Sequence, residues 1–160
     1  MARLRCKQHV QTKAMLYGLE NEDSAVEQYV DSTACHVYSC GFVVNPSASH
    51  LGCTPDRNVY DVNEEFPYGL LEVKCPQVES FSEAKCLKVV NGTRSLKRNH
   101  AYYYQVMGQM ALTGYDWCDF MVWCAHDYHV ERIYFDASIF KEMKMKLDMF
   151  FFQHYLPQVV

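Results

Sequence analysis

The stretch Gly69-Leu-Leu-Glu-Val-Lys-Cys-Pro76 predicts a buried strand that stops at a proline, because proline cannot donate a hydrogen bond to a neighbouring strand. Side chains alternate along a strand, so Glu72 and Lys74 point to one face and Val73 to the other. A carboxylate and an ammonium on an otherwise apolar strand are costly to bury unless charges, hydrogen bonds or a metal compensate. Taken alone, they are most simply a structural ion pair.

The composition predicts one compact domain, 1–160, with a hydrophobic core, because 49% of the residues are hydrophobic. The longest apolar run, residues 120–125, has only the length of a strand, so no membrane span is expected. The N-terminus lacks a signal-peptide core, which predicts a soluble intracellular protein, cytoplasmic or nuclear, with eight reduced cysteines. A net charge of −4 argues against a general basic coat for nucleic acid but allows local basic patches.

The order of elements predicts an α/β domain with a central mixed sheet of about five strands flanked by helices. Gly18 is expected to precede the first helix, and the phenylalanines at 150–152 are expected to cap the core. A loop or small hairpin should surround Asn91-Gly92. The expected helices are 19–30, 79–87, 100–114 and 138–155, and the expected strands are 36–44, 58–62, 69–75, 116–125 and 129–136.

Three further residues fall where they could join Glu72. Asp56 follows Pro55 at the start of strand 58–62, and antiparallel pairing with residues 69–75 would bring both carboxylates to one end of the sheet. Glu22 is the one acid on the packing face of helix 19–30, although chance placement is an equal alternative. Gln105 lies one turn before Gln109 in helix 100–114, on a stripe that is otherwise aromatic and apolar.

Carboxylates on adjoining elements suit hard divalent cations, here Mg²⁺ with Mn²⁺ as a substitute, because these ions prefer oxygen ligands. The candidate ligands are Asp56, Glu72 and Glu22, and the backbone carbonyl of Val73 could add another oxygen. Lys74 would orient the attacking water and hold positive charge near the phosphorus. The combination predicts metal-assisted hydrolysis of a phosphodiester.

One concentrated basic patch lies beside the Asn91-Gly92 turn and also includes Lys88. A solvated loop is its simplest interpretation, and contact with DNA phosphates is the functional one. The candidates for that contact are Arg94, Lys97 and Arg98.

Pro55-Asp56 followed by Glu72-Val73-Lys74 resembles the PD-(D/E)XK nuclease superfamily. More narrowly, residues 15–155 resemble YqaJ-type viral recombinase domains, the group that includes phage lambda exonuclease. The matching segments are Gly18-x-x-x-Glu22-x-x-Ala25-x-x-x-Tyr29, Gly52 to Asp56, Gly69 to Pro76, Tyr103 to Met110, Cys118 to Trp123 and Val130 to Asp136.

The resemblance implies a restriction-endonuclease-like core and a magnesium-dependent exonuclease that digests linear duplex DNA from 5′ ends for recombination or repair. Asp56 and Glu72 would be metal ligands, Lys74 the catalytic lysine, Glu22 an additional acid and Gln105 an active-site glutamine. By analogy with the family, the resemblance also suggests assembly into a trimeric ring and a single-strand annealing protein as partner.

The chain departs from the family pattern at three positions. Arg57 stands where glycine commonly follows the Pro-Asp pair, and could stiffen the turn or contact a phosphate. Thr54 replaces the usual serine, and Gln109 stands where related nucleases often carry tyrosine. None of these changes removes a catalytic group, so an active enzyme is expected.

Three alternatives stay open on the sequence alone. The same core could act as an endonuclease or a single-strand nuclease, or as an inactive DNA-binding module. A zinc site is the third, although the spacings fit no familiar ligand pattern. Its two candidate ligand sets are Cys118, Cys124, His126 and His129, or Cys35, His36 and Cys40.

Overall fold

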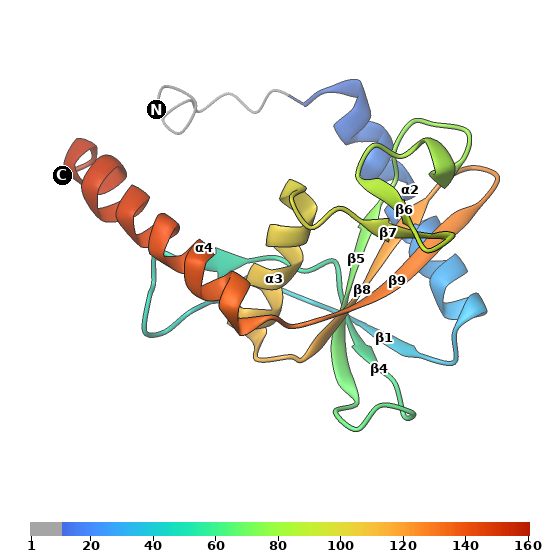
Figure 1. The fold of residues 1–160 in the computed structure, drawn as a ribbon, viewed down its shortest axis with the longest axis horizontal. Helices are drawn as coiled ribbons and strands as arrows, with labels where there is room; N and C mark the ends of the chain where they lie inside the picture. The colour runs from blue at the N-terminus through green and yellow to red at the C-terminus, as the bar shows by residue number, and fades with distance from the viewer. Residues whose placement is uncertain (1–10) are drawn as a thin grey trace.

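The computed structural model describes residues 11–160, and its centre is a five-stranded sheet covered by helices (Figure 1). The strands are ordered β1-β4-β5-β8-β9. Strands β5 and β8 run parallel, and the other neighbouring pairs run antiparallel. The expected mixed sheet flanked by helices is therefore confirmed.

The elements follow one another along the described chain with short connections. Strands β2 and β3 form a separate hairpin, as do β6 and β7. The bounds are α2 Lys13–Ser32, β1 His36–Ser39, β2 Val43–Val44, β3 Gly52–Cys53, β4 Arg57–Tyr60, β5 Tyr68–Lys74, β6 Leu87–Val90, β7 Thr93–Leu96, α3 Ala101–Thr113, β8 Trp117–Trp123, β9 Tyr128–Tyr134 and α4 Ala137–Met149.

Strand β5 separates two apolar cores. Leu70 packs with residues of α3 on one face, while Leu71 and Val73 pack with residues of α2 on the other. Gly69 lies against Trp117 of β8, and a Cβ atom there would be 2.3 Å from the indole ring, so only glycine fits. The alternation expected along this strand is confirmed.

Helix α2 begins at Lys13, so the expected start after Gly18 is wrong. The side chain of Thr12 caps the helix by accepting a hydrogen bond from the N–H of Met15 at 3.2 Å. A glycine inside a helix costs only about 1 kcal/mol relative to alanine, which does not stop a helix with such a cap. The expected packing face is confirmed by the burial of Ala25, Val26 and Tyr29.

Helix α3 confirms the helix expected at 100–114. His100 caps its first turn, and Gly114 ends it in a left-handed conformation. The preceding β6–β7 hairpin turns at Asn91 and Gly92, with φ angles of 50° and 81°. Asn-Gly favours such two-residue hairpin turns because both central residues need positive φ.

Two expected elements are wrong in part. The strand expected at 36–44 is divided, because β1 pairs with β4 whereas β2 pairs with β3. The helix expected at 79–87 is only a short 3₁₀ helix, Phe81–Glu83. Asp127 accepts hydrogen bonds from the Ser80 hydroxyl and the Phe81 N–H, which fixes the start of this short helix.

Helix α4 packs against α3 and continues through a π-helix at Phe150–Tyr155, away from the sheet (Figure 1). The expectation that the phenylalanines at 150–152 cap the core is wrong, because Phe150 and Phe152 are exposed. Phe151 instead stacks on His50, whose ring nitrogen lies 2.8 Å from Asp148. His50, in the loop of the β2–β3 hairpin, therefore links that loop to the C-terminal helical segment.

Within residues 11–160, no helix is both long enough and apolar enough to cross a membrane. The seven cysteines of this range are all free thiols. The N-terminal residues on which the expectation of an intracellular location depends lie outside the described range.

Candidate active site

The pairing of β4 with β5 brings two carboxylates to one end of the sheet. Arg57 pairs with Leu71, so Asp56 lies just before β4 and Glu72 just beyond this pair. The N–H of Val73 donates a hydrogen bond to Oδ2 of Asp56 at 2.7 Å. The antiparallel strands expected from the sequence thus carry both acids to the same edge.

Glu72 is only 1% exposed, and three side chains donate hydrogen bonds to its carboxylate. Its Oε1 atom accepts from the ammonium of Lys74 and from Nε2 of Gln105 at 2.6 Å. Its Oε2 atom accepts from Nε2 of Gln109 at 2.7 Å. Helix α3 supplies both amides because residues four apart share one helix face. The buried carboxylate therefore has the partners that its burial requires.

Lys74 is a cation held between a carboxylate and an aromatic ring. Its ammonium contacts Glu72 and lies 4.9 Å from the centre of the Tyr102 ring. Burial alone would lower the pKa of Lys74, but Glu72, and next Asp56, raise it above the ordinary value. Lys74 is therefore protonated at neutral pH, where it can donate hydrogen bonds and stabilise negative charge.

Asp56 is the acid of the site whose ionisation is disfavoured. Its pKa is raised to about 6, first by burial and then by the charge of Glu72, against the opposing effect of the Val73 N–H. Two neighbouring carboxylates that repel each other gain from a nearby cation.

Asp56→Asn is expected to stabilise the protein at pH 7.5 by about 1–3 kcal/mol in chelator. Because the folded-state pKa is raised to about 6, the stability that Asp56 contributes is fully present below about pH 4 and is lost as the pH rises through 6. Asparagine cannot ionise, so the advantage of the variant should vanish at pH 4. Urea unfolding at both pH values measures this, and a variant less stable than the parent at pH 7.5 would contradict it.

An open cleft of about 670 Å³ lies at this end of the sheet. Its walls come from α2, the end of β5, the segment before β6 and the start of α3, and its lining includes Asp56, Val73 and Lys74. A second cavity of about 460 Å³, between α3, α4 and the β2–β3 hairpin, is lined in part by Gln105 and Gln109. The carboxylates and their partners thus lie between two hollows of the surface.

Glu22 lines the same cleft, but an arginine engages it. The guanidinium of Arg57 donates to Oε1 of Glu22 at 2.9 Å, to Asp23 at 2.8 Å and to the carbonyl of Asp56 at 2.7 Å. These contacts join α2 to the Pro-Asp turn. The proposed phosphate contact of Arg57 stays a prediction, as does metal binding by Glu22.

The three basic residues expected to bind DNA lie on or beside the β6–β7 hairpin, and none lines the cleft. Arg98 is over the ring of Tyr103, with 5.9 Å from guanidinium carbon to ring centre. The ammonium of Lys97 donates to the carbonyl of Lys85. Arg94 is half-buried in β7. Their role in binding DNA stays a prediction.

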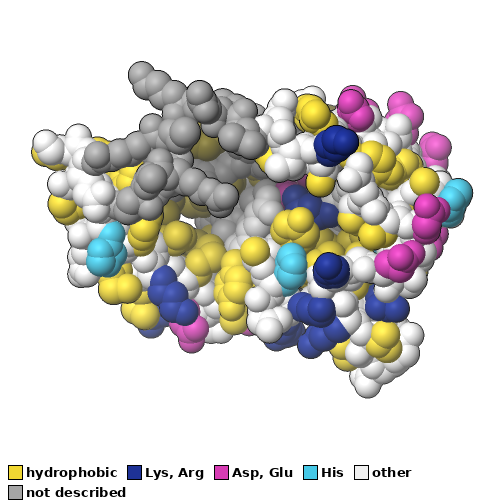
Figure 2. All heavy atoms as spheres, turned by 90° about the horizontal axis from the view of Figure 1, so that it is seen from above, with side chains coloured by type: hydrophobic (Ala, Val, Ile, Leu, Met, Phe, Trp, Pro, Cys, Tyr) yellow, Lys and Arg dark blue, Asp and Glu magenta, His cyan; other side chains and the backbone are white. Residues whose placement is uncertain are grey.

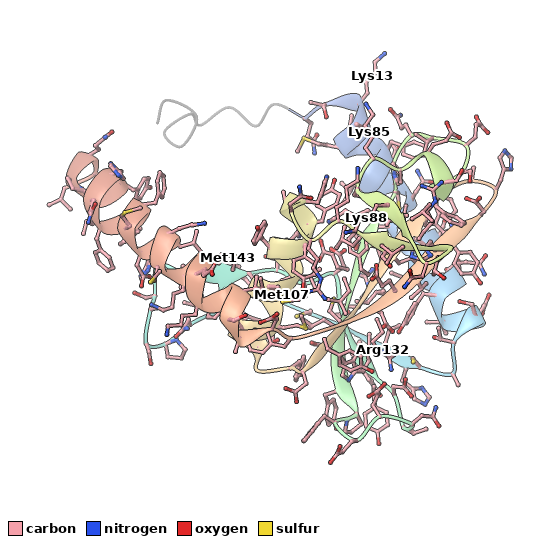
Figure 3. All side chains as sticks on the ribbon, in the orientation of Figure 1. Lys13, Lys85, Lys88, Met107, Arg132 and Met143 are labelled. Atoms are coloured by element: carbon pink, nitrogen blue, oxygen red, sulfur yellow. The ribbon has the colours of Figure 1, made fainter. Side chains whose placement is uncertain are left out.

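Sequence reasoning missed two exposed lysines, Lys13 and Lys85, that accompany Lys88 of the predicted basic patch. Figure 3 shows Lys13 on α2, Lys85 just before β6 and Lys88 on β6 along one side of the molecule. Among these, Lys85 lines the cleft. Figure 2 shows that basic side chains gather in the middle of this face, next to a hollow, while acidic ones collect towards one end. Lys13 is far in sequence from the other two, so no local charge run connects it with Lys85 and Lys88.

Sequence reasoning also missed the contact of Gln109 with Glu72, although its one-turn spacing from Gln105 was visible. His100 and Tyr102 line the cleft as well, beside Lys74. Neither of the two zinc ligand sets forms, because no group of three or more His, Cys, Asp or Glu side chains within residues 11–160 could hold a metal ion. For the same reason, the three acids Asp56, Glu72 and Glu22 do not form one such group.

Two solved structures resemble this chain over most of its length. The crystal structure of an alkaline exonuclease (LHK-Exo) from Laribacter hongkongensis matches with a TM-score of 0.72 and 29% sequence identity, over 92% of this chain and 71% of that one. The crystal structure of LHK-Exo in complex with dAMP matches with the same values. No curated protein matches the chain. The expected restriction-endonuclease-like fold is confirmed by the match to the alkaline exonuclease.

The family is shown by a match over most of the chain. The model of the YqaJ-like viral recombinase domain matches residues 2–116, which include Glu22, Asp56, Glu72, Lys74 and Gln105. The chain belongs to the family of YqaJ-like viral recombinase domains.

Proposed function

We propose that the protein is a metal-dependent DNA exonuclease that hydrolyses linear duplex DNA from 5′ ends in recombination or repair. The observation that carries this proposal is the buried Glu72 carboxylate, held by Lys74 beside Asp56 at the edge of an open cleft. Membership of the recombinase family and the likeness to an alkaline exonuclease support the same activity.

The residues at this edge fit a magnesium ion. Asp56 and Glu72 repel each other, and this repulsion helps to raise the pKa of Asp56. The N–H and C=O of a strand residue point to the same side, so the Val73 carbonyl faces the edge where its N–H meets Asp56. Two carboxylates and one carbonyl, with water and substrate phosphate, form the donor set that Mg²⁺ typically uses. Mn²⁺ prefers similar ligands and should substitute.

Each residue of the candidate active site would then have a role in hydrolysis. When bound, a divalent ion would act as a Lewis acid that makes water a better nucleophile and neutralises phosphate charge. Asp56, Glu72 and the Val73 carbonyl would hold that ion. Lys74, protonated and fixed by Glu72, would place positive charge where negative charge develops on the phosphate. Arg57 holds Oε1 of Glu22, so Oε2 is the oxygen that Glu22 would offer to that ion.

Three exposed lysines, of which Lys85 lines the cleft, would hold the DNA backbone. Lys13, Lys85 and Lys88 are exposed, and no salt bridge engages them within the described residues. Phosphate contacts release counterions, so each contact steepens the dependence of affinity on salt concentration. Contacts from Arg94, Lys97 and Arg98 would add to this on the hairpin.

Lys85→Ala combined with Lys88→Ala is expected to reduce the slope of log affinity against log salt by about 2, because each lost phosphate contact removes about 0.9. Fluorescence anisotropy with a labelled duplex in chelator measures binding without cleavage. Lys141→Ala is the matched control, since this exposed lysine lies on α4. An unchanged slope in the double variant would show that these lysines do not touch the backbone.

The activity itself is tested with end-labelled linear duplex and closed circular DNA, each with magnesium and with chelator. The proposal predicts loss of the linear DNA in magnesium only, release of mononucleotides from the 5′ end, and intact circles. Cleavage of circles would favour an endonuclease, and digestion restricted to unpaired DNA a single-strand nuclease. Binding without any hydrolysis would indicate an inactive DNA-binding module. A trimeric ring and an annealing partner stay predictions from the family.

A further inference from the structure

One amide of α3, almost fully buried, is hydrogen-bonded to the candidate active site. Gln109 is 2% exposed, and its Nε2 atom donates to Oε2 of Glu72 at 2.7 Å. An ionised carboxylate only accepts hydrogen bonds, so the nitrogen of the amide must face it. Consequently its Oε1 atom points away, and it is buried without a hydrogen-bond partner in the described structure.

The burial of this unpaired amide oxygen destabilises the core. The neighbours of Gln109 on the buried side of α3 include Val106 and Met110, which are apolar. A methionine would fill the same volume without burying an unpaired carbonyl, which costs free energy. The feature that glutamine supplies and methionine does not is the hydrogen bond to Glu72.

The other two donors to Glu72 are placed differently. Gln105 is exposed and Lys74 is partly exposed, and both bind the same oxygen, Oε1. Lys74 also lines the cleft, where a phosphate would compete for its ammonium. Rotation about the last bond of a glutamate side chain is soft, so a carboxylate held at one oxygen can turn. Gln109 is the donor that fixes the second oxygen.

We propose that Gln109 is a positioning residue that sets the orientation of the Glu72 carboxylate and keeps its Oε1 atom turned towards Lys74, which lines the cleft. This role rests on the proposed function, in which Glu72 holds a divalent ion. A partner that orients a ligand in this way typically changes metal affinity or activity 10–100-fold when it is replaced.

The test is Gln109→Met, which keeps the side-chain volume and removes the donor, with Gln109→Asn as a second variant that keeps an amide but withdraws it by one methylene. Met110→Leu is the matched control, because it is buried on the same helix and makes no hydrogen bond to Glu72. Crystal structures show where the Glu72 carboxylate lies, and steady-state hydrolysis of linear duplex in magnesium gives kcat and KM.

The expected result is a Glu72 carboxylate that is rotated or present in two orientations, with kcat reduced about 10–100-fold and the KM for DNA within about twofold. The control should keep both the geometry and the rate. A carboxylate in its parental orientation in both Gln109 variants would overturn the inference, and so would a rotated one with an unchanged kcat. If the parental protein hydrolyses no DNA, the proposed function fails, while the crystal structures still decide whether Gln109 orients Glu72.

Discussion

Lys74→Met is expected to lower kcat for magnesium-dependent hydrolysis of linear duplex DNA by about 10²–10³-fold or more. Methionine keeps most of the aliphatic stem but removes the ammonium that contacts Glu72 and lies over the Tyr102 ring. Because the raised pKa keeps Lys74 charged at neutral pH, the wild-type side chain offers a fixed positive charge to a phosphate that gains negative charge. The variant loses this stabilisation in the transition state.

Single-turnover hydrolysis of 5′-labelled duplex measures the rate, with thermal unfolding to establish that the variant is folded. Glu72 retains the two α3 amides, so the fold should survive. Lys141→Met on α4 is the matched control and should cleave at the parental rate. A folded Lys74→Met protein that degrades linear duplex as fast as the parent would show that the catalytic cation lies elsewhere.

The edge of the sheet that carries Asp56 and Glu72 could be predicted from the sequence because its determinants are local. The pattern at 69–76 identifies a buried strand and its end, and an antiparallel partner starting near Asp56 brings the two acids together. Alternation along the strand then assigns Glu72 and Lys74 to one face. Each of these steps uses residues that are neighbours in the chain or in the ladder.

The partners of these acids could not be predicted, because they depend on how distant elements pack. Gln109 is 37 positions from Glu72, and its helical stripe alone indicates burial without naming what it meets. Arg57 is 35 positions from Glu22, and the residues around Arg57 do not indicate whether its side chain is exposed or paired. The predicted start of α2 is wrong for a different reason, because one glycine inside a helix costs little and the Thr12 cap sets where the helix begins.

The far side of the sheet carries a second charged network, which was also missed. Arg132 on β9 binds both carboxylate oxygens of Asp119 on β8, at 2.8 Å each. Asp119, only 3% exposed, also accepts a hydrogen bond from the hydroxyl of Tyr29 on α2 at 2.6 Å. The same guanidinium lies 3.8 Å from the Trp117 ring and binds Asp61 and Glu64 in the β4–β5 connection. One side chain thus links α2, β8, β9 and that connection.

Arg132→Met is expected to destabilise the fold by about 3–5 kcal/mol, because it leaves the buried Asp119 carboxylate without its cation. A domain of this kind has only about 5–15 kcal/mol of stability in total, so much of the protein could be unfolded at 37 °C. Adding Asp119→Asn should recover part of the loss, since the unpaired charge is the main cost and its effect is not additive with that of Arg132. Urea unfolding at neutral pH measures both variants.

Loss of the Arg132–Asp119 network should affect stability without affecting hydrolysis at the Glu72 site. Arg132 does not line the cleft, and Asp119 shares the sheet face of Trp117, opposite to Glu72. At a temperature where Arg132→Met is still folded, its rate per folded molecule should therefore match the parental rate. Lys141→Met, on α4, is the control for loss of a surface charge and should change stability by less than about 0.5 kcal/mol. A stable Arg132→Met protein would mean that water or another cation already compensates Asp119.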